Sequence, residues 1–454
     1  MHPTTGQYRE RARETIDEHP EVREAVTAAT LAFDRSRERA FAELDAGAWR
    51  AWAEQVKDHA LTNLGDQLEQ AERNLVARGA RVHWAESAAD VAALLRSLVE
   101  QHSVRRAVKG KSMLSEELGV NTVLEGVGVE VFETDLGEYI IQLLGEPPSH
   151  IVGPAIHRSL AEIQALFHER FGTPVDASPE TLAAAARRVL REAFLTADLG
   201  ITGCNFLVAE TGSLAVMENE GNIRLTSSLP RVHVALVGIE KVIPRWSDLA
   251  AFLQITARSA TGQRVGTFVS VLQGPRGEEG DGPDELHVVL VDNGRTRVLA
   301  DPEAWKTLRC VRCGACLNTC PVYRQTGGHA YGWVYSGPIG AVLAPAMLGL
   351  EAAHPLPFAS SLCGACADVC PVRIPIPDLL IEWRRRSVEQ GLTPWWERAA
   401  MSGYAGAALR PGLFGVAERL LRALPVVPPA WTDERTAPRP AGRSFRERWQ
   451  EGDV

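Results

Sequence analysis

The chain has 454 residues, of which 48 are Lys or Arg and 57 are Asp or Glu, so its formal net charge is −9. This acidic balance argues against a broad phosphate-binding surface, and therefore against nucleic acid as a partner. The length exceeds that of one average domain and predicts two or three folded units.

The sequence also argues against export and membrane insertion. Residues 1–25 are charged throughout and lack the apolar core of a secretory signal. The longest apolar stretch, residues 339–350, includes Pro345 and is shorter than the roughly 20 residues that cross a bilayer as a helix. We therefore expect a cytoplasmic protein without a transmembrane segment.

Two different periodicities divide the first 300 residues. Apolar residues at three- and four-residue spacing predict an N-terminal helical arm over residues 1–75. Over residues 76–300, short apolar strands alternate with amphipathic helices, which predicts an α/β domain with a largely parallel sheet and helices on both faces. The segment HIVGPA is expected to continue this alternation, and the Gly-, Pro- and acid-rich segment 274–285 to form a loop.

The rest of the chain divides into two parts. Residues 301–385 hold seven of the eight cysteines and predict a small, mainly α, ferredoxin-like domain with two clusters. Residues 386–454 predict a C-terminal helical tail. Its basic amphipathic stretch, residues 409–424, is expected to pack as an ordinary helix, with docking to a partner or a membrane surface as the alternative.

The cysteine spacing is the most specific feature of the sequence. The first run, from Cys310 to Cys320, fits C-x2-C-x2-C-x3-C-P at every position. The second run, from Cys363 to Cys370, repeats the last three cysteines of that pattern and its proline. Cytosolic thiols stay reduced, so such dense runs favour metal binding over disulfides, and this pattern is typical of two-cluster ferredoxins.

The same pattern predicts how the thiolates are divided. In two-cluster ferredoxins, the first three thiolates of a run hold one cluster and the fourth crosses to the other. The predicted ligands are Cys310, Cys313, Cys316 and Cys370 for the first cluster, and Cys320, Cys363 and Cys366 for the second. The second site is one thiolate short, because Ser360 stands where a fourth cysteine would be. Either a three-iron cluster forms there, or a fourth iron binds Ser360, water, another side chain or a substrate.

Alternative roles for the cysteines are less consistent with the pattern. Two C-x2-C pairs would suffice for zinc, which does not need an array of seven thiolates. A purely structural cluster is a second alternative, but two clusters with interleaved ligands must lie close together, which suits electron transfer. The isolated Cys204 is expected to be a small buried residue.

Polar residues of the α/β domain give weaker signals. A strand followed by KGKS at a helix start predicts either an anion site or ordinary charged surface. Glu210, before a glycine turn, is expected either to cap that turn or to act as a nucleophile. The other polar residues considered for a pocket are Lys109, Lys111, Ser112, Glu133, Asp135, Glu138, Thr211 and Ser213. Aromatic residues after the first cysteine run are expected to pack over a cluster; they are His329, Tyr331, Trp333 and Tyr335.

Four long segments resemble the lactate utilization protein B family: KGKSMLSEELGVN, ETDLGEYIIQLLGEPPSHIVGPAIH, AETGSLAVMENEGNIRLTSSLPRVHVALVGIEK and CVRCGACLNTCPVYRQTGGHAYGWVYSGPIGAVL. The resemblance extends from about residue 55 to residue 385. It implies a lactate-utilisation α/β domain related in fold to the sugar-phosphate isomerase and CoA-transferase group. It also implies two 4Fe-4S clusters on the seven cysteines, because a second run of three is the family's own pattern.

The resemblance further implies a function. Members of this family are cytosolic iron–sulfur proteins that are made with two other lactate-utilisation proteins and are needed to oxidise L-lactate to pyruvate. We therefore expect the electron-transfer subunit of such a complex, with an unassigned electron acceptor. No G-x-G-x-x-G fingerprint opens a helix after the first strand, so the hydride or carbanion step is expected on another polypeptide.

Two rival functions stay open at this point. One is a ligand-binding or acyl-transfer enzyme that uses the α/β pocket, with its clusters as sensor or scaffold. The other is an iron–sulfur assembly or regulatory adaptor, whose clusters need not cycle between redox states.

Overall fold

The computed structural model describes residues 3–277, 280–423 and 441–453. The chain divides into two compact units, Met1–Arg385 and Arg386–Val454. Four long helices precede the first strand, as the apolar spacing predicts; they are α1 (Tyr8–Glu18), α2 (Pro20–Phe41), α3 (Ala46–Thr62) and α4 (Leu64–Ala77).

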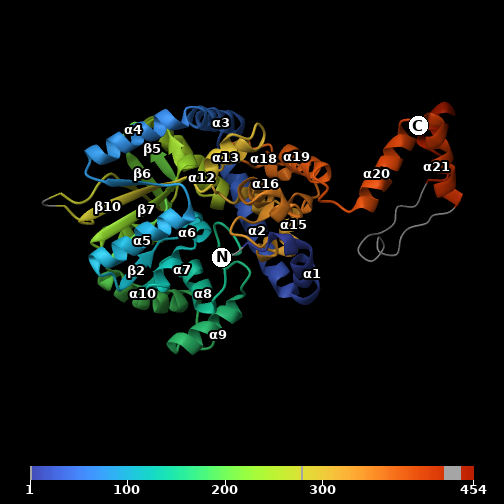
Figure 1. The fold of residues 1–454 in the computed structure, drawn as a ribbon. Coiled ribbons are helices and arrows are strands. Elements are labelled where there is room, and N and C mark those ends of the chain that lie inside the picture. The colour runs from blue at the N-terminus through green and yellow to red at the C-terminus, as the bar shows by residue number, and fades with distance from the viewer. Residues whose placement is uncertain (1–2, 278–279, 424–440, 454) are drawn as a thin grey trace. The chain divides into compact units, whose positions relative to one another are not determined.

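A six-stranded parallel sheet forms the centre of the first unit (Figure 1). Its order is β1-β10-β7-β4-β2-β3. The strands are β1 (Arg81–Ala85), β2 (Arg106–Lys109), β3 (Glu130–Glu133), β4 (Leu199–Thr202), β7 (Val232–Gly238) and β10 (Glu285–Val291). The two central strands β4 and β7 are buried along their whole length, as expected for a sheet that is covered on both faces.

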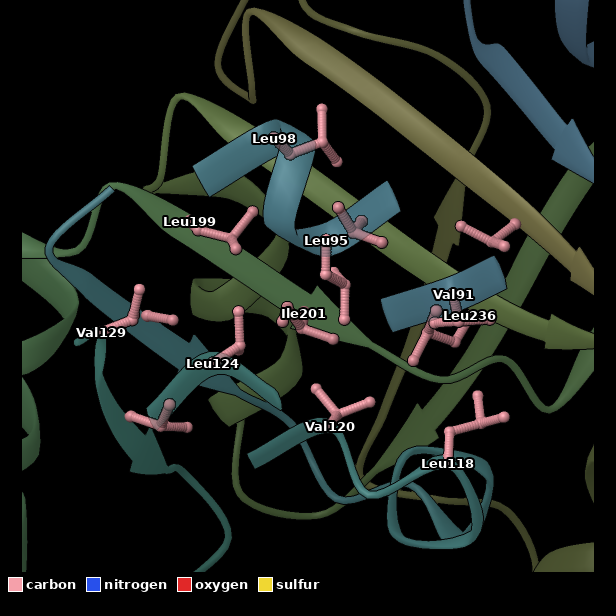
Figure 2. Packing of buried hydrophobic residues seen from close by; sticks show 14 of the residues in the cluster. Val91, Leu95, Leu98, Leu118, Val120, Leu124, Val129, Leu199, Ile201 and Leu236 are labelled. Carbon is pink, nitrogen blue, oxygen red and sulfur yellow. The ribbon is translucent and has the colours of Figure 1, made fainter. Parts of the chain in front are cut away.

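Helices cover both faces of this sheet, as the alternating pattern predicts. Val234 and Leu236 of β7 pack into the same apolar cluster as residues of α5, whereas Ala235 and Val237 face the cluster that includes α4. Figure 2 shows residues of α5 lying over Leu199 of β4. The helices between the strands are α5 (Ala88–His102), α6 (Met113–Leu118), α7 (Val120–Glu125), α8 (Leu136–Leu144), α9 (Leu160–Phe171), α10 (Pro179–Thr196), α11 (Asn222–Ser228) and α12 (Trp246–Thr261), and α13 (Arg295–Leu299) follows the last strand.

A second, four-stranded sheet lies within the same unit, in the order β8-β5-β6-β9. Its strands are β5 (Phe206–Val208), β6 (Ser213–Glu218), β8 (Val242–Ile243) and β9 (Phe268–Leu272). The β5–β6 hairpin is antiparallel and turns at residues 209–212. The apolar runs after residue 200 are therefore strands, as predicted, but they are shared between two sheets.

The expectation that HIVGPA continues the strand pattern is wrong. Residues 150–155 form bends and turns. The ring Nδ1 of His150 accepts the backbone N–H groups of Val152 and Gly153, both at 3.1 Å. These donors are therefore not available to a neighbouring strand, and Pro154 has no N–H group to offer. The segment instead lies against the cysteine region, where His150 Nε2 hydrogen-bonds Asn318 Oδ1 at 3.0 Å.

The cysteine region consists mainly of short helices, some of which pack on α1 and α2 (Figure 1). They are η3 (Ala304–Arg309), α14 (Ala315–Asn318), α15 (Pro321–Thr326), η4 (His329–Tyr331), α16 (Gly337–Leu348), α17 (Leu350–Ala353), η5 (Leu356–Phe358), α18 (Ala365–Asp368) and α19 (Ile376–Glu389). The apolar stretch 339–350 falls mostly in α16, which is largely buried in the protein.

The second unit contains α20 (Trp395–Ala408), α21 (Pro411–Ala423) and α23 (Phe445–Gln450). The predicted amphipathic stretch 409–424 includes α21, and its last residue lies outside the described residues, as do residues 278–279 of the predicted loop 274–285. None of the helices in the described parts of the chain combines the length and apolar composition needed to cross a membrane.

Candidate metal centre

Both cysteine runs fold into the same local structure. The residues on either side of Cys313 and Cys363 have left-handed backbone angles: Arg312 (φ 61°), Gly314 (φ 75°), Leu362 (φ 56°) and Gly364 (φ 87°). A single helical turn then follows in each run, α14 in the first and α18 in the second. Arginine and leucine pay an energetic cost in this conformation, so its repetition indicates a turn that both runs require.

The structure brings all seven clustered cysteines together, in two groups. The first cysteine group is Cys310, Cys313, Cys316 and Cys370, which line one small cavity with mostly apolar walls. The second cysteine group is Cys320, Cys363 and Cys366. Burial, followed by the neighbouring thiols Cys320 and Cys363, raises the pKa of Cys366 to about 12. Cysteines from two runs more than 40 positions apart in sequence thus meet in each group.

The two groups adjoin each other. Helices α14 and α18, which carry Cys316 and Cys366, pack together. Burial strongly raises the pKa of Cys316, and Cys366 is one of the thiols whose charge acts in the same direction. This contact between groups is what interleaved ligation requires.

Backbone amides point at several of the sulfur atoms. The N–H groups of Arg312 and Tyr323 donate to Cys310 Sγ and Cys320 Sγ, both at 3.4 Å. The N–H of Ile374 donates to Sγ of Cys370 at 3.3 Å. Hydrogen bonds of this kind stabilise negative charge on sulfur and are one determinant of the potential of an iron–sulfur cluster.

The donor set fits an iron–sulfur cofactor. Five of the seven thiols are buried, Cys310 is half-buried and Cys363 is exposed. Burial raises the pKa of Cys370 to about 11, so the metal-free site would hold neutral thiols. Soft thiolates without carboxylate or imidazole ligands select soft metals such as zinc or the iron of clusters. Zinc takes four ligands and would leave the adjoining second group of three thiols incomplete.

Cationic side chains lie beside the cysteine groups. Arg50 of α3 donates through Nε to the carbonyl of Cys370 and through Nη2 to that of Ala367, both at 2.8 Å. Arg309 pairs with Asp58 and Glu54 of the same helix. The N-terminal helices therefore hold the second cysteine run in place, which no local sequence pattern had indicated.

Of the aromatic residues after the first run, Tyr331, Trp333 and Tyr335 are buried and His329 is half-buried, and they contact different partners. Tyr331 packs against Tyr8 and Tyr323 and lies near Cys320. Tyr335 packs under the guanidinium of Arg312, which lies 4.4 Å from the ring centroid. His329 Nε2 hydrogen-bonds the carbonyl of Pro147 at 2.8 Å. These contacts support a packing role for the aromatic side chains. The His329 ring is directed toward a backbone carbonyl oxygen.

The KGKS segment is occupied by internal ion pairs. Lys109 is fully buried and pairs with Glu116 at 2.8 Å and Glu133 at 2.9 Å. Lys111 pairs with Asp135 at 3.0 Å. Ser112 caps α6 by accepting the N–H of Ser115. Burial and then the charge of Glu133 raise the pKa of Glu138 well above its usual value.

Two further candidates have ordinary structural roles. The Glu210 carboxylate accepts the backbone N–H of Trp246 at 2.7 Å, at the start of α12, while Thr211 and Ser213 hydrogen-bond each other at 2.7 Å. Cys204 lies beside the second sheet and donates to the carbonyl of Phe206 at 3.0 Å, and burial raises its pKa to about 12. A neutral thiol of this kind is a poor nucleophile.

A cavity of about 590 Å³ opens where β2, β4 and β7 end at the carboxyl edge of the parallel sheet. This edge is where open α/β sheets usually bind ligands. Its polar lining includes Lys111, Asp135, Glu218, Glu220, Glu240, Lys241, Arg295 and Arg312, and Cys313 forms part of its wall. The cavity therefore reaches the first cysteine group.

A buried ionic network joins the cavity to the cysteine region, and the sequence analysis missed it. Arg295 pairs with Glu117 at 2.9 Å and Glu240 at 2.6 Å, and all three side chains are about 1 % exposed. The Tyr335 hydroxyl also donates to Glu117, at 2.7 Å. The available signal was the position of Glu240 just after the buried strand 232–238, where parallel strands present functional side chains.

Comparisons with known proteins agree with this architecture. Residues 68–291 match the family model described as LUD domain, and residues 306–374 match the one described as 4Fe-4S dicluster domain. Residues 386–454 match the one described as Lactate utilisation protein B, C-terminal. The cysteine region is therefore an iron–sulfur domain of the 4Fe-4S type.

Relatives extend over nearly the whole chain. Lactate utilization protein B of Macrococcus caseolyticus is 42% identical, covering 92% of this chain and 92% of its own length. The protein of the same name from Bacillus velezensis is 45% identical, with 90% and 87% coverage. A protein of Escherichia coli named uncharacterized electron transport protein YkgF is 44% identical, with 90% and 86% coverage.

Proposed function

The chain belongs to the lactate utilization protein B family, and from this premise we propose that it is the electron-transfer subunit of a complex that oxidises L-lactate to pyruvate. A role in lactate utilisation and electron transfer follows from the family and from the 4Fe-4S dicluster domain. The observation that carries the more specific proposal is the convergence of two adjoining cysteine groups. Adjoining redox centres serve electron relay.

The reaction sets the number of electrons that must pass. Oxidation of L-lactate to pyruvate breaks the C2–H and O–H bonds and forms the C2=O bond, releasing two electrons and two protons. Iron–sulfur clusters exchange electrons one at a time. We place the bond-breaking step and the release of protons on a partner polypeptide, and the transfer of both electrons to an acceptor on this chain.

The ligand assignment follows the two cysteine groups. Cys310, Cys313, Cys316 and Cys370 would hold the first 4Fe-4S cluster, and Cys320, Cys363 and Cys366 the second. The small cavity lined by the first group supports the assignment of Cys370 to the first cluster despite its place in the second run. The charge interaction of Cys366 with Cys320 supports the opposite crossing.

The remaining parts of the proposal concern the location of the protein, its partners and its domains. We propose a cytoplasmic location, because reduced thiols are needed for cluster assembly, and assembly with two other lactate-utilisation proteins. We also propose domains at residues 76–300 and 301–385, the first related in fold to the sugar-phosphate isomerase and CoA-transferase group. Its parallel sheet supports this relation. Residues 1–75 and 386–454 would be a helical arm and tail.

Loss of the first cluster tests the function. Anaerobically purified protein should contain about eight irons and eight sulfides. Cys313→Ser should lose the first cluster and fail to restore growth on L-lactate in a strain that lacks this protein. Cys204→Ser is the control, because Cys204 belongs to neither group, and it should grow normally. Full growth with Cys313→Ser would refute the assignment to lactate oxidation.

A second candidate function is ligand binding in the α/β domain. The observation that favours it is the cavity of about 590 Å³, a size within the range of small-molecule sites. Acyl transfer gains no support, because the Glu210 carboxylate already caps α12. Calorimetric titration of the cluster-loaded protein with L-lactate or pyruvate tests this candidate. Saturable heat that Glu240→Gln abolishes would support ligand binding in the cavity. Absence of heat would exclude L-lactate and pyruvate as its ligands.

A further inference from the structure

The second cysteine group is one protein ligand short of a four-iron site, and the structure supplies a residue for the missing place. Ser360 precedes Cys363 by three residues, just as Cys310 precedes Cys313. Sequence spacing alone does not show whether the two segments fold alike. Their backbones decide the question.

The turn that leads into each run is the same. Cys310 Sγ accepts the N–H of Arg312 at 3.4 Å, and Ser360 Oγ accepts the N–H of Leu362 at 3.1 Å. In both cases the donor is two residues further along the chain and has a left-handed backbone, with φ of 61° for Arg312 and 56° for Leu362. The Ser360 oxygen therefore occupies, within its own run, the place of the Cys310 sulfur.

The Ser360 backbone is also fixed from outside the run. Arg384 of α19 donates through Nη2 to the carbonyl of Ser360 at 3.0 Å and through Nε to that of Pro357 at 2.9 Å. The same guanidinium lies 5.3 Å from the ring centroid of Phe358. Two hydrogen bonds from one planar group restrict the loop's position, as a ligand that must meet a fixed metal atom requires.

We propose that Ser360 Oγ is the fourth protein ligand of the second cluster, so that this site holds four irons with three thiolates and one serine oxygen. The inference rests on the cluster assignment proposed above. Binding forms an iron–oxygen bond and breaks the serine O–H bond, and the proton passes to water because Ser360 is only half-buried. The charge of the site stays the same as with a fourth thiolate.

An oxygen ligand makes the two clusters chemically different. Oxygen is a harder donor than sulfur and stabilises the ferric state more strongly. The second cluster is therefore harder to reduce than it would be with four thiolates. Its unique iron is also the one most easily removed, because it is held by a hard serine oxygen and not by a soft thiolate.

Wild-type protein and two variants at Ser360, all full-length, enriched with ⁵⁷Fe and purified without oxygen, test the ligand. In wild-type protein, Mössbauer spectra should show one iron in about eight with parameters of an oxygen-bound site. Ser360→Ala should lose that component and convert to about seven irons, with the EPR signal of an oxidised three-iron cluster. Ser360→Cys should keep about eight irons, all with sulfur-type parameters.

Ser361→Ala is the matched control, because Ser361 is the exposed neighbour of Ser360 in the same loop. It should behave as wild type. The inference is overturned if Ser360→Ala keeps its iron count and Mössbauer spectrum, or if wild-type protein already holds a three-iron cluster at this site. A wild-type protein without any cluster would instead refute the proposed function, so the two failures are distinguishable.

Discussion

Replacing Arg50 tests whether the N-terminal helices are part of the cluster site. Arg50 makes two charged hydrogen bonds of 2.8 Å to the backbone carbonyls of Cys370 and Ala367. A hydrogen bond to a charged group contributes about 1.5–3 kcal/mol. Arg50→Met should therefore make local opening of this loop easier by about 3 kcal/mol, taking the lower value for each bond.

The expected effect is on the rate at which iron leaves the protein. A change of about 3 kcal/mol corresponds to roughly a hundredfold larger open population, since about 1.4 kcal/mol is a factor of ten. We expect Arg50→Met to lose visible absorbance about a hundredfold faster in excess ferrous chelator without oxygen. Arg50→Lys should be intermediate, because an ammonium group cannot hold both carbonyls in the same fork geometry.

Arg373→Met is the matched control, because Arg373 belongs to the loop after Cys370 that Arg50 contacts. Arg373 donates to the carbonyl of Gly47 at 2.9 Å, but its side chain is 43% exposed and its ion pair with Glu54 is long, at 3.8 Å. Exposed interactions of this kind contribute less than about 1 kcal/mol. If Arg50→Met and Arg373→Met lose iron at rates within threefold of each other, the structural role of Arg50 is wrong.

Three further predictions test the ligand partition, the ionic network and a buried lysine. Cys370→Ser should alter the EPR signals of the first cluster more than those of the second; loss of only the second cluster's signals would contradict the partition. Tyr335→Phe removes the 2.7 Å hydrogen bond to Glu117 and should accelerate unfolding in guanidinium about tenfold, the equivalent of about 1.5 kcal/mol, whereas the exposed control Tyr404→Phe should not. Burial lowers the pKa of Lys57 to about 7, so between pH 7 and about 10 the unfolded chain binds more protons and stability should rise with pH. Urea unfolding at pH 7 and pH 9 should show this rise in wild type and a flatter profile in Lys57→Met; equal slopes would rule out the shift.

The parallel sheet and the cysteine groups could be predicted because their determinants are local. Buried strands give continuous apolar runs such as HVALVG. A helix with one buried face, such as α5, gives apolar residues at three- and four-residue spacing. Thiolates two residues apart reach the same cluster irrespective of the rest of the fold. The strands, the helices and each cysteine run are therefore recognisable within a dozen residues, whereas the exchange of Cys320 and Cys370 between the runs was expected from the two-cluster ferredoxin pattern.

The segment HIVGPA shows where local pattern fails. Its apolar residues resemble a short strand, yet His150 takes up the N–H groups of Val152 and Gly153. The imidazole is positioned by Asn318, 168 residues away, and burial lowers its pKa to about 4, so the ring stays neutral and can accept hydrogen bonds. The conformation is set by a contact between the α/β domain and the cysteine region, which no window of sequence contains.

Sequence patterns did not identify the cavity residues Glu240 and Arg295, for a related reason. Glu240 lies just after β7 and Arg295 opens α13 after β10, and neither belongs to a recognisable motif. They become a pair only because β7 and β10 are neighbours in the sheet, which brings the turns after both strands to the same edge. The apolar pattern predicts that both strands exist, but it does not predict that they are neighbours in the sheet.

The role of Ser360 depends on a local sequence count and also on the folded backbone. Counting residues back from Cys363 identifies the position, and the same count applies to any serine that happens to precede such a run. What distinguishes a ligand from a chance neighbour is the backbone that carries it. A left-handed leucine at position 362 is unfavourable unless the surrounding structure holds it there. The first run maintains the same conformation at Arg312, beside a cysteine group that lines a cavity. The second run adopts this costly conformation beside Ser360, as expected if the Ser360 oxygen has to be held at a fixed place.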